Sequence, residues 1–408
     1  MLTRLAAALM LSLAAITWQT HAHGRAEQEK ASDSRAIVFP DTAEYLTLVA
    51  DLHTHSVFSD GHVWPRIRVE EALRDGLDAM AVTEHLEYQP HRVDISHPDR
   101  NRAYEIAAAA ARDSNLIVIR GSEITRRAPA GHMNAVFLSD ANQLLRVAAP
   151  PEDPAETDAY YTAASEWPAE EAVLAANQQG AFVFWNHPYW TRQQPDGLAR
   201  ITKFQADLVE SGKLHGIEIA NGRHYSEEAF QIGLDHDLAL IGVSDVHELI
   251  DWDYNVAGGG HRPVTLVYAQ ERSGHAIREA LFKRRTVVWF KNLLIGRPSE
   301  LDPLLAACVT LRSAHYVADT EVVSVTLVNH SDARFILQNK STHTFMWHPD
   351  ILELPPHSET EVQVKPGALV NKLTLRFEVM NALIAPKTHP VLKLMTDVSD
   401  VPELASTP

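Results

Sequence analysis

The feature that most constrains the fold is a succession of seven short apolar runs with helical stretches between most of them. The apolar runs have the length and the β-branched and aromatic content of buried strands. They span residues 46–52, 79–82, 116–119, 133–138, 182–185, 216–219 and 240–243. The helical stretches span residues 66–74, 100–112, 166–179, 201–211 and 227–235. Strands that alternate with helices predict an α/β fold with a parallel sheet, either open or closed into a barrel.

Polar clusters rich in histidine and carboxylate residues border these runs. The carboxyl ends of parallel strands in an α/β barrel point to one mouth, so clusters distant in the sequence should converge there. The clusters are Asp51-Leu-His53-Thr-His55, Ser59-Asp60-Gly61, Thr83-Glu84-His85, Gly121-Ser-Glu123, Gly131-His132-Met-Asn134, Asn186-His187-Pro188 and Ser244-Asp245-Val-His247. A single buried histidine is more often a hydrogen-bonded core residue than a metal ligand. Burying this many polar groups without cations would cost several kcal/mol each, so the set predicts a site for several metal ions.

Two pairs with i, i+2 spacing indicate how such a site could be built. Side chains two residues apart on a strand face the same side, so His53 and His55 could hold one cation, and Asp245 and His247 have the same spacing. Imidazole and carboxylate ligands without thiolates suit Zn²⁺, Mn²⁺ or Fe²⁺. The absence of cysteine ligands argues against a closed structural zinc site.

The amino-terminal end differs from this central part. Residues 1–22 place Arg4 before a short apolar stretch and end in small residues, which predicts a cleavable signal peptide and a periplasmic or secreted protein. A membrane anchor is the alternative, but the apolar stretch is too short to cross a bilayer. Residues 23–45 are expected to form a leader.

The rest of the chain divides into a catalytic barrel over residues 46–300 and a small β-rich domain over residues 301–408, where alternating runs occur without helices. This boundary stays open, because residues 264–268 and 286–290 could be strands of either part. Residues 148–166, rich in proline, alanine and acidic residues, predict a long loop or insertion.

The composition of the chain limits the kinds of partner that it can bind. A formal net charge of -17 argues against a nucleic-acid duplex, because binding phosphate chains requires a basic surface. Cys308 is the only cysteine, so no intramolecular disulfide can form. No segment after the signal peptide is apolar enough for membrane insertion. The expected partner is a small-molecule substrate, and the sequence leaves a homo-oligomer open.

The ordered clusters from residue 50 to residue 247 resemble the signature of the PHP (polymerase and histidinol phosphatase) superfamily of metal-dependent phosphoesterases. The resemblance implies a distorted (β/α)7 barrel and a centre of three divalent ions. In the ligand set that it implies, the first ion takes His53, His55, Glu123 and Asp245, the second takes His132 and His187 and shares Glu123, and the third takes Asp60, His85 and His247. His62 is the alternative to Asp60.

Within the superfamily, the signal peptide, the loop and the β-rich tail are similar to secreted Sb-PDE-type phosphodiesterases, as is the segment Gly260-His-Arg-Pro-Val-Thr-Leu-Val-Tyr268. This likeness implies hydrolysis of small organic phosphodiesters. Two neighbouring ions would hold a bridging hydroxide for in-line attack on phosphorus.

Residues outside the ligand set could bind phosphoryl oxygens or protonate the leaving group. Arg223 and Arg262 suit phosphate contact, and His224 and His261 suit general acid catalysis. For His224 and His261 a supporting or surface role is an equal alternative, whereas for Arg223 and Arg262 a structural ion pair is favoured over substrate contact.

Other residues near the clusters have expected roles in support of the site. Asp51 and Glu84 are expected to orient histidines. Trp185, Tyr189 and Trp190 favour core packing over a pocket wall.

Three functions remain open. Hydrolysis of small phosphodiesters is the leading hypothesis. A phosphomonoesterase is the second, and three or more basic residues at the mouth would favour it. The third is a periplasmic metal-binding protein without catalysis, which the complete set of competent ligands disfavours. An amide or lactone hydrolase on a related barrel is a further alternative.

Overall fold

A computed structural model of the chain describes residues 35–92, 94–95, 99–145, 163 and 166–401. The predicted signal peptide lies outside the described residues, as do the first part of the leader and most of the predicted loop at residues 148–166.

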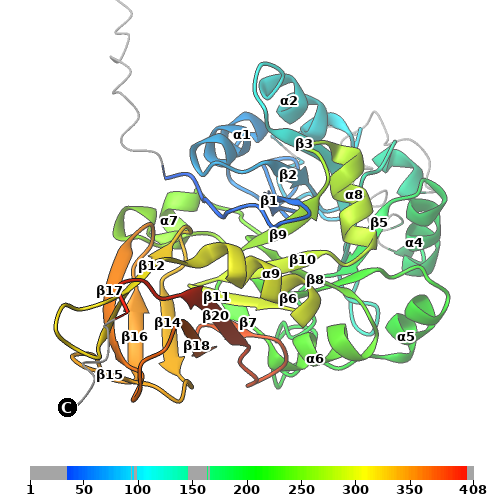
Figure 1. Cartoon of the computed structure of the whole chain (residues 1–408). Helices are drawn as coiled ribbons and strands as arrows, with labels where there is room; N and C mark the ends of the chain where they lie inside the picture. The colour runs from blue at the N-terminus through cyan, green and yellow to red at the C-terminus, as the bar shows by residue number, and fades with distance from the viewer. Residues whose placement is uncertain (1–34, 93, 96–98, 146–162, 164–165, 402–408) are drawn as a thin grey trace, which may run out of the picture. The chain divides into compact units, whose positions relative to one another are not determined.

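All seven predicted runs form strands of one curled sheet (Figure 1). The strands are β1 (Leu46–Asp51), β2 (Ala79–Val82), β3 (Ile117–Ile124), β4 (Met133–Val136), β5 (Phe182–Trp185), β6 (Gly216–Asn221) and β8 (Ala239–Val243). Strands β1, β2 and β3 pair in parallel, and so do β5, β6 and β8.

Strand β4 joins these two parallel sets and runs antiparallel to both of its neighbours. The prediction of a wholly parallel sheet is therefore wrong at β4. A parallel crossover needs a connection long enough to return along the strand, usually a helix, whereas residues 125–132 between β3 and β4 contain no helix.

Further antiparallel strands extend the sheet beyond β1. Strand β9 (Val264–Ala269) pairs with β1, β10 (Thr286–Phe290) pairs with β9, and β11 (Leu293–Gly296) pairs with β10. The two runs that the sequence left between domains thus belong to the barrel sheet. A short strand, β7 (His224–Tyr225), pairs with the end of β6.

The predicted helices are confirmed within a few residues at each end. They are α1 (Pro65–Arg74), α2 (Arg102–Ala110), α4 (Ala169–Gln178), α5 (Lys203–Glu210) and α6 (Glu227–Asp235), followed by α7 (Ile250–Tyr254) and α8 (Gly274–Phe282). Local sequence explains several of the starts: Pro65 occupies the first turn of α1, and the hydroxyls of Ser226 and Ser273 accept backbone N–H groups at the starts of α6 and α8.

Alternation along β1 separates two parts of the core. Leu48, Ala50 and Leu52 belong to an apolar cluster shared with β2, β5, β8 and β9. Val49 belongs to a different cluster, which it shares with Val69 of α1. Successive side chains of a strand point to opposite faces, so this division is expected for a sheet buried on both sides.

The β-rich region begins after α9 (Pro298–Cys308), a helix that the sequence did not predict. One antiparallel sheet contains β12 (Val309–Tyr316), β13 (Val323–Asn329), β17 (Glu359–Lys365) and β15 (Thr344–Phe345), and the other contains β16 (Ile351–Leu354), β14 (Phe335–Asn339), β18 (Lys372–Val379) and β20 (Val391–Asp397). Strand β19 (Ala382–Leu383) leaves this domain and pairs with β11 of the barrel sheet. Within the described part of the chain, no helix combines the length and the apolar character needed to cross a bilayer.

Candidate metal centre

The strand ends bring all nine predicted metal ligands into one cluster. Most of these residues follow a strand or end it, as predicted, but His132 precedes β4. Because β4 runs antiparallel to β3, its amino-terminal end lies beside the carboxyl end of β3, and this direction brings His132 to Glu123.

The first group consists of His53, His55, Asp245 and one oxygen of Glu123. The Nε2 atoms of His53 and His55 are 2.9 Å apart, and Asp245 Oδ1 lies 3.1 Å from the first and 3.0 Å from the second. Glu123 Oε2 lies 3.7 Å from Nε2 of His53 and 3.6 Å from that of His55. The ligand atoms of His53, His55 and Asp245 lie close enough to hold one ion, and Glu123 Oε2 lies beside the two imidazoles.

The second group uses the other oxygen of Glu123. Glu123 Oε1 lies 3.0 Å from His132 Nδ1 and 3.5 Å from His187 Nε2. The second oxygen of Asp245, Oδ2, lies 3.9 Å from His187 Nε2. Glu123 and Asp245 therefore each face both groups, which is the arrangement of bridging carboxylates.

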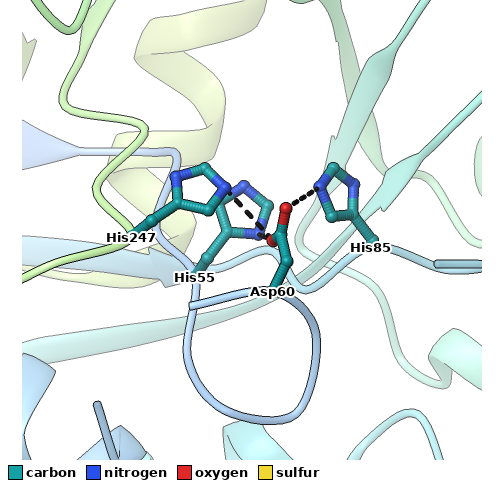
Figure 2. Close-up of side chains that lie close together, drawn as sticks. All are labelled: His55, Asp60, His85 and His247. Atoms are coloured by element: carbon teal, nitrogen blue, oxygen red, sulfur yellow. Dashed lines mark ion pairs between the residues drawn. The ribbon is translucent and has the colours of Figure 1, made fainter. Parts of the chain in front are cut away.

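The third group is centred on Asp60 (Figure 2). His247 Nε2 lies 3.1 Å from Asp60 Oδ1, and His85 Nε2 lies 3.3 Å from Asp60 Oδ2. His85 also connects this group to the others, because its Nδ1 lies 2.6 Å from Glu123 Oε2. The alternative ligand, His62, is exposed and pairs instead with Glu248 at 2.5 Å, so the structure brings Asp60 to the cluster and not His62.

Asp245 and His247 face different groups despite their i, i+2 spacing. Asp245 has a φ of 50°, in the left-handed region, so the backbone is not extended between the two residues. His187 has a φ of 25°. Such values are unfavourable for residues other than glycine and concentrate at functional sites.

Gly61 explains the glycine of the Ser-Asp-Gly motif. A Cβ atom at this position would lie 2.8 Å from the carbonyl carbon of His55 and 2.8 Å from the nitrogen of Ser56. Only glycine allows the loop to approach this closely, and the approach positions Asp60 beside His55.

Buried carboxylates control the protonation of the histidines around them. Burial by itself would lower the pKa of His53, but three neighbouring carboxylates, Asp245 foremost, raise it well above its usual value. Neighbouring carboxylates also outweigh burial at His85, whose pKa is raised well above its usual value, and at His247, whose pKa is raised to about 9. Burial and the nearby His247 lower the pKa of His55 to about 3. The cluster therefore favours positive charge, which cations would supply.

The donor set fits divalent cations. Glu123 Oε2 and Asp60 Oδ1 are buried and accept no hydrogen bond of good geometry among the described residues, although each faces an imidazole nitrogen at 2.6 and 3.1 Å, respectively. A buried carboxylate oxygen is costly without a partner, and a metal ion provides one. Three sets of ligand atoms lie close enough to hold an ion: His55, Asp60, His85 and His247; His53, His55 and Asp245; and His85, Glu123 and His132.

Comparison with known proteins identifies the family. A two-domain protein from Bacteroides vulgatus, containing a predicted PHP-like metal-dependent phosphoesterase, is 39% identical, with 89% of this chain and 98% of that chain aligned at a TM-score of 0.77. This chain belongs to the PHP-like metal-dependent phosphoesterases. The predicted distorted barrel with a β-rich carboxyl-terminal domain is therefore confirmed.

Other comparisons bear on parts of this PHP-like chain. A family model for an Ig-like domain, DUF5001, matches residues 309–395. A putative metal-dependent phosphoesterase from Bifidobacterium adolescentis is 20% identical over 48% of this chain and 87% of that chain, with a TM-score of 0.35, which is too low to support an inference. No curated protein matches the chain.

Glu218 supports the PHP-like centre from β6, and the sequence interpretation missed it. Its side chain is fully buried, and its Oε1 lies 2.7 Å from His53 Nδ1. Its Oε2 accepts hydrogen bonds from the backbone N–H of His187 and from Asn221 Nδ2, at 2.7 and 2.8 Å. Asn221 also donates to Asp245 Oδ2 at 3.0 Å. Glu218 thus orients ligands of both the first and the second group.

Asn186 was noted in the sequence without a role, and the structure gives it one. Its Nδ2 donates to Glu123 Oε1 at 2.7 Å, and its Oδ1 accepts from the backbone N–H of Asn134. This buried amide fixes the carboxylate that faces both metal groups.

The two acids expected to orient histidines act indirectly. Glu84 accepts hydrogen bonds from the hydroxyls of Ser56 and Ser59, and the Ser59 hydroxyl lies 3.2 Å from His55 Nδ1. Asp51 accepts from the Ser244 hydroxyl at 2.6 Å and from the Arg262 guanidinium at 3.2 Å. Neither carboxylate bonds directly to a histidine ring among the described residues.

Arg262 is buried beside the centre and not exposed at its mouth. Its side chain is 1% exposed, and it pairs with Asp75 at 2.5 Å and with Asp51 at 3.2 Å. The guanidinium has no access to a phosphate at the mouth, so it does not make the substrate contact considered for it and forms the structural ion pair that was the favoured alternative. No motif around Arg262 indicates that its side chain turns away from the mouth.

His261 also points away from the mouth. Its ring stacks on Trp289, with centroids 3.4 Å apart and planes at 7°, and its Nδ1 lies 2.8 Å from the Arg262 carbonyl. Burial lowers its pKa to about 4, so the imidazole is neutral near pH 7. A neutral, stacked histidine does not suit the predicted general acid role.

Arg223 and His224 remain at the surface, beside the end of β6. Arg223 donates to the backbone carbonyl of Asp253 at 2.8 Å and is mostly exposed. His224 is exposed, and its carbonyl accepts a hydrogen bond from Tyr189.

The three aromatic residues near His187 have different positions. Trp185 and Tyr189 are buried in the core, as expected. Trp190 is 36% exposed and stands edge-on to His132 and His187, with ring centroids 5.4 Å away in both cases. It lines a cleft of about 1770 Å³ that also contains the ligands Asp60, His85 and His132.

Proposed function

We propose that this PHP-like phosphoesterase hydrolyses small organic phosphodiesters with three divalent ions, Mn²⁺, Zn²⁺ or Fe²⁺. The observation that carries the proposal is the cleft of about 1770 Å³ beside Asp60, His85 and His132, which is much larger than a phosphoryl group and therefore suits a substrate with ester substituents. Export to the periplasm or the medium is part of the proposal and rests on the sequence of residues 1–22.

The side chains of the centre have different proposed roles: some hold the ions, some orient those ligands, and one supplies a proton. When bound, divalent ions would supply charge neutralisation for phosphoryl oxygens and a water of lowered pKa. Glu123 and Asp245 would hold the ions of the first and second groups side by side, because each directs one oxygen to each group. Glu218 and Asn186 would keep these ligands in place without touching the substrate. His224, an exposed imidazole on β7, is the candidate to protonate the departing alkoxide.

A phosphomonoester is the second candidate, and a specific observation favours it. Four arginines line the cleft: Arg92, Arg126, Arg127 and Arg192. This exceeds the three basic residues that we expected of a site for a phosphate dianion. However, Arg126 is committed to Glu87 and to the Trp167 carbonyl. Arg127 and Arg192 have no hydrogen bond or ion pair among the described residues, so they suit a monoester dianion as well as a charged substituent on a diester.

One assay separates the two candidates. The protein is loaded with Mn²⁺ or Zn²⁺, and turnover of 4-nitrophenyl phosphate is compared with turnover of ethyl 4-nitrophenyl phosphate. We expect the diester to have the higher kcat/KM, and a higher value for the monoester would contradict the proposal. The Asp245→Asn variant, prepared in parallel, should lose both activities, which excludes a contaminating phosphatase.

A further inference from the structure

We propose that the substrate carries a second oxyanion, a carboxylate or a phosphate, away from the scissile ester, and that Arg127 and Arg192 bind it. This inference rests on the proposed function and specifies its substrate class. The binding site is the arginine wall of the cleft, defined here as Arg92, Arg127 and Arg192.

The arginine wall stands out from the charge of the whole protein. The chain has a formal net charge of -17, yet four arginines line this one cleft. Among the residues that the structure describes, the acidic ones that line the cleft are Asp60, Glu87 and Glu166. Asp60 belongs to the third metal group, and Glu87 pairs with Arg126. The remaining positive charge in the cleft suits an anionic ligand.

Two residues of the wall have guanidinium groups available for a ligand. Arg127 and Arg192 are exposed, and neither side chain has an ion pair or hydrogen bond within the part of the chain that the structure describes. A guanidinium group binds carboxylate and phosphate through paired N–H donors, which matches both forms of the proposed oxyanion.

The position of Arg192 separates this oxyanion from the reacting phosphoryl group. The Arg192 guanidinium lies 5.5 Å from the centre of the Trp190 ring, and that ring in turn stands 5.4 Å from His132 and His187. Arg192, His132 and His187 thus all lie beside the Trp190 ring. A substituent that extends along Trp190 from a phosphoryl group at the ligands would approach the Arg192 guanidinium.

The first test uses esters that differ only in the charge at the end of the substituent. Propyl, 2-carboxyethyl and 2-phosphonoethyl esters of 4-nitrophenyl phosphate represent the neutral, carboxylate and phosphate-like forms. Because hydrogen bonds to charged groups are strong, at least one charged ester should exceed the neutral one about tenfold in kcat/KM. The ester with the larger gain identifies the oxyanion.

Variants connect this preference to the arginines. The double variant Arg127→Gln/Arg192→Gln should lose the preference and keep its activity on the propyl ester. Arg112→Gln, a change at an exposed arginine outside the cleft, serves as the matched control and should keep the preference. Equal rates on all three esters in the unmodified protein, or a preference that survives in the double variant, would overturn the inference.

A binding measurement distinguishes failure of the inference from failure of the proposed function. Calorimetry compares 3-phosphonopropionate with propylphosphonate, which lacks the carboxylate and cannot be hydrolysed either. Tighter binding of 3-phosphonopropionate by about tenfold, lost in the double variant, would support the oxyanion site even if no diester were hydrolysed. Hydrolysis of diesters with equal binding of the two phosphonates and no gain for the 2-phosphonoethyl ester would sustain the function and refute the oxyanion site.

Discussion

Glu218 offers a sharp test of how the centre is held together, through the substitution Glu218→Gln. Its two oxygens serve three partners: the ring of His53, the backbone N–H of His187 and the amide of Asn221. Glutamine has one acceptor oxygen, so its NH₂ group must face at least one of these donors. Loss of a group that orients metal ligands typically lowers metal affinity about 10–100-fold, which corresponds to about 1.4–2.7 kcal/mol.

In the assay, metal-free protein is titrated with Mn²⁺, and the affinity is measured by calorimetry and by competition with a chelator. We expect weaker binding in Glu218→Gln and unchanged binding in Glu210→Gln, which alters an exposed carboxylate at the end of α5. Circular dichroism and urea unfolding establish that both variants are folded. Unchanged Mn²⁺ affinity in folded Glu218→Gln would refute the role assigned to this residue.

Further predictions concern stability, protonation and processing. Arg68→Met removes a buried guanidinium that pairs with Glu71 and donates to the backbone carbonyls of His55 and His247. Because Glu71 then lies buried without its partner, the free energy of unfolding, measured with urea, should fall by about 3–5 kcal/mol. Because the pKa of His261 is lowered to about 4 in the folded protein, its contribution to stability is present above pH 6.5 and is lost as the pH falls toward 4. His261→Phe should therefore remove up to about 3 kcal/mol of the pH dependence of the free energy of unfolding in urea. An unchanged pH profile would contradict this role of His261. Metal binding must displace the proton of His247, whose pKa is about 9 without metal, so affinity should rise with pH below 9 and the calorimetric enthalpy should vary with the buffer. Amino-terminal sequencing of the exported protein should show that the mature chain begins near residue 23.

Much of the barrel could be predicted because each strand carries a local pattern. Two of the seven apolar runs coincide with their strands, β3, β6 and β8 are one to four residues longer, and β1 and β4 are one or two residues shorter; the histidines beside them converge as expected. The direction of β4 could not be predicted from its own residues. It depends on the lack of a helix in residues 125–132, and a loop with the right length was the only available indication.

The ligands were easier to predict than the residues that support them. The i, i+2 spacing of His53 and His55 marks them as candidate metal ligands, whereas Glu218 is a single carboxylate within an apolar strand. Its partner His53 lies 165 positions away, so no local pattern connects them. The single indication was the carboxylate itself, because an unpaired acid rarely occupies a buried strand.

Sequence also could not show which way side chains turn near the mouth. His261 and Arg262 precede β9, whose start lies beside the end of β1, so their position in the chain was compatible with catalysis. The structure turns one toward Trp289 and the other toward Asp75. Conversely, Arg127 and Arg192 carry no motif, and only the fold places them in the same cleft.

The central claim is that nine side chains from separate strand ends hold a cluster of divalent ions. Anomalous diffraction from crystals of the Mn²⁺-loaded, active protein tests it most directly. We predict three peaks: one among His53, His55 and Asp245, one beside His132 and His187, and one among Asp60, His85 and His247. Active crystals with no anomalous peak among these residues, or with Mn²⁺ bound only elsewhere, would contradict the claim.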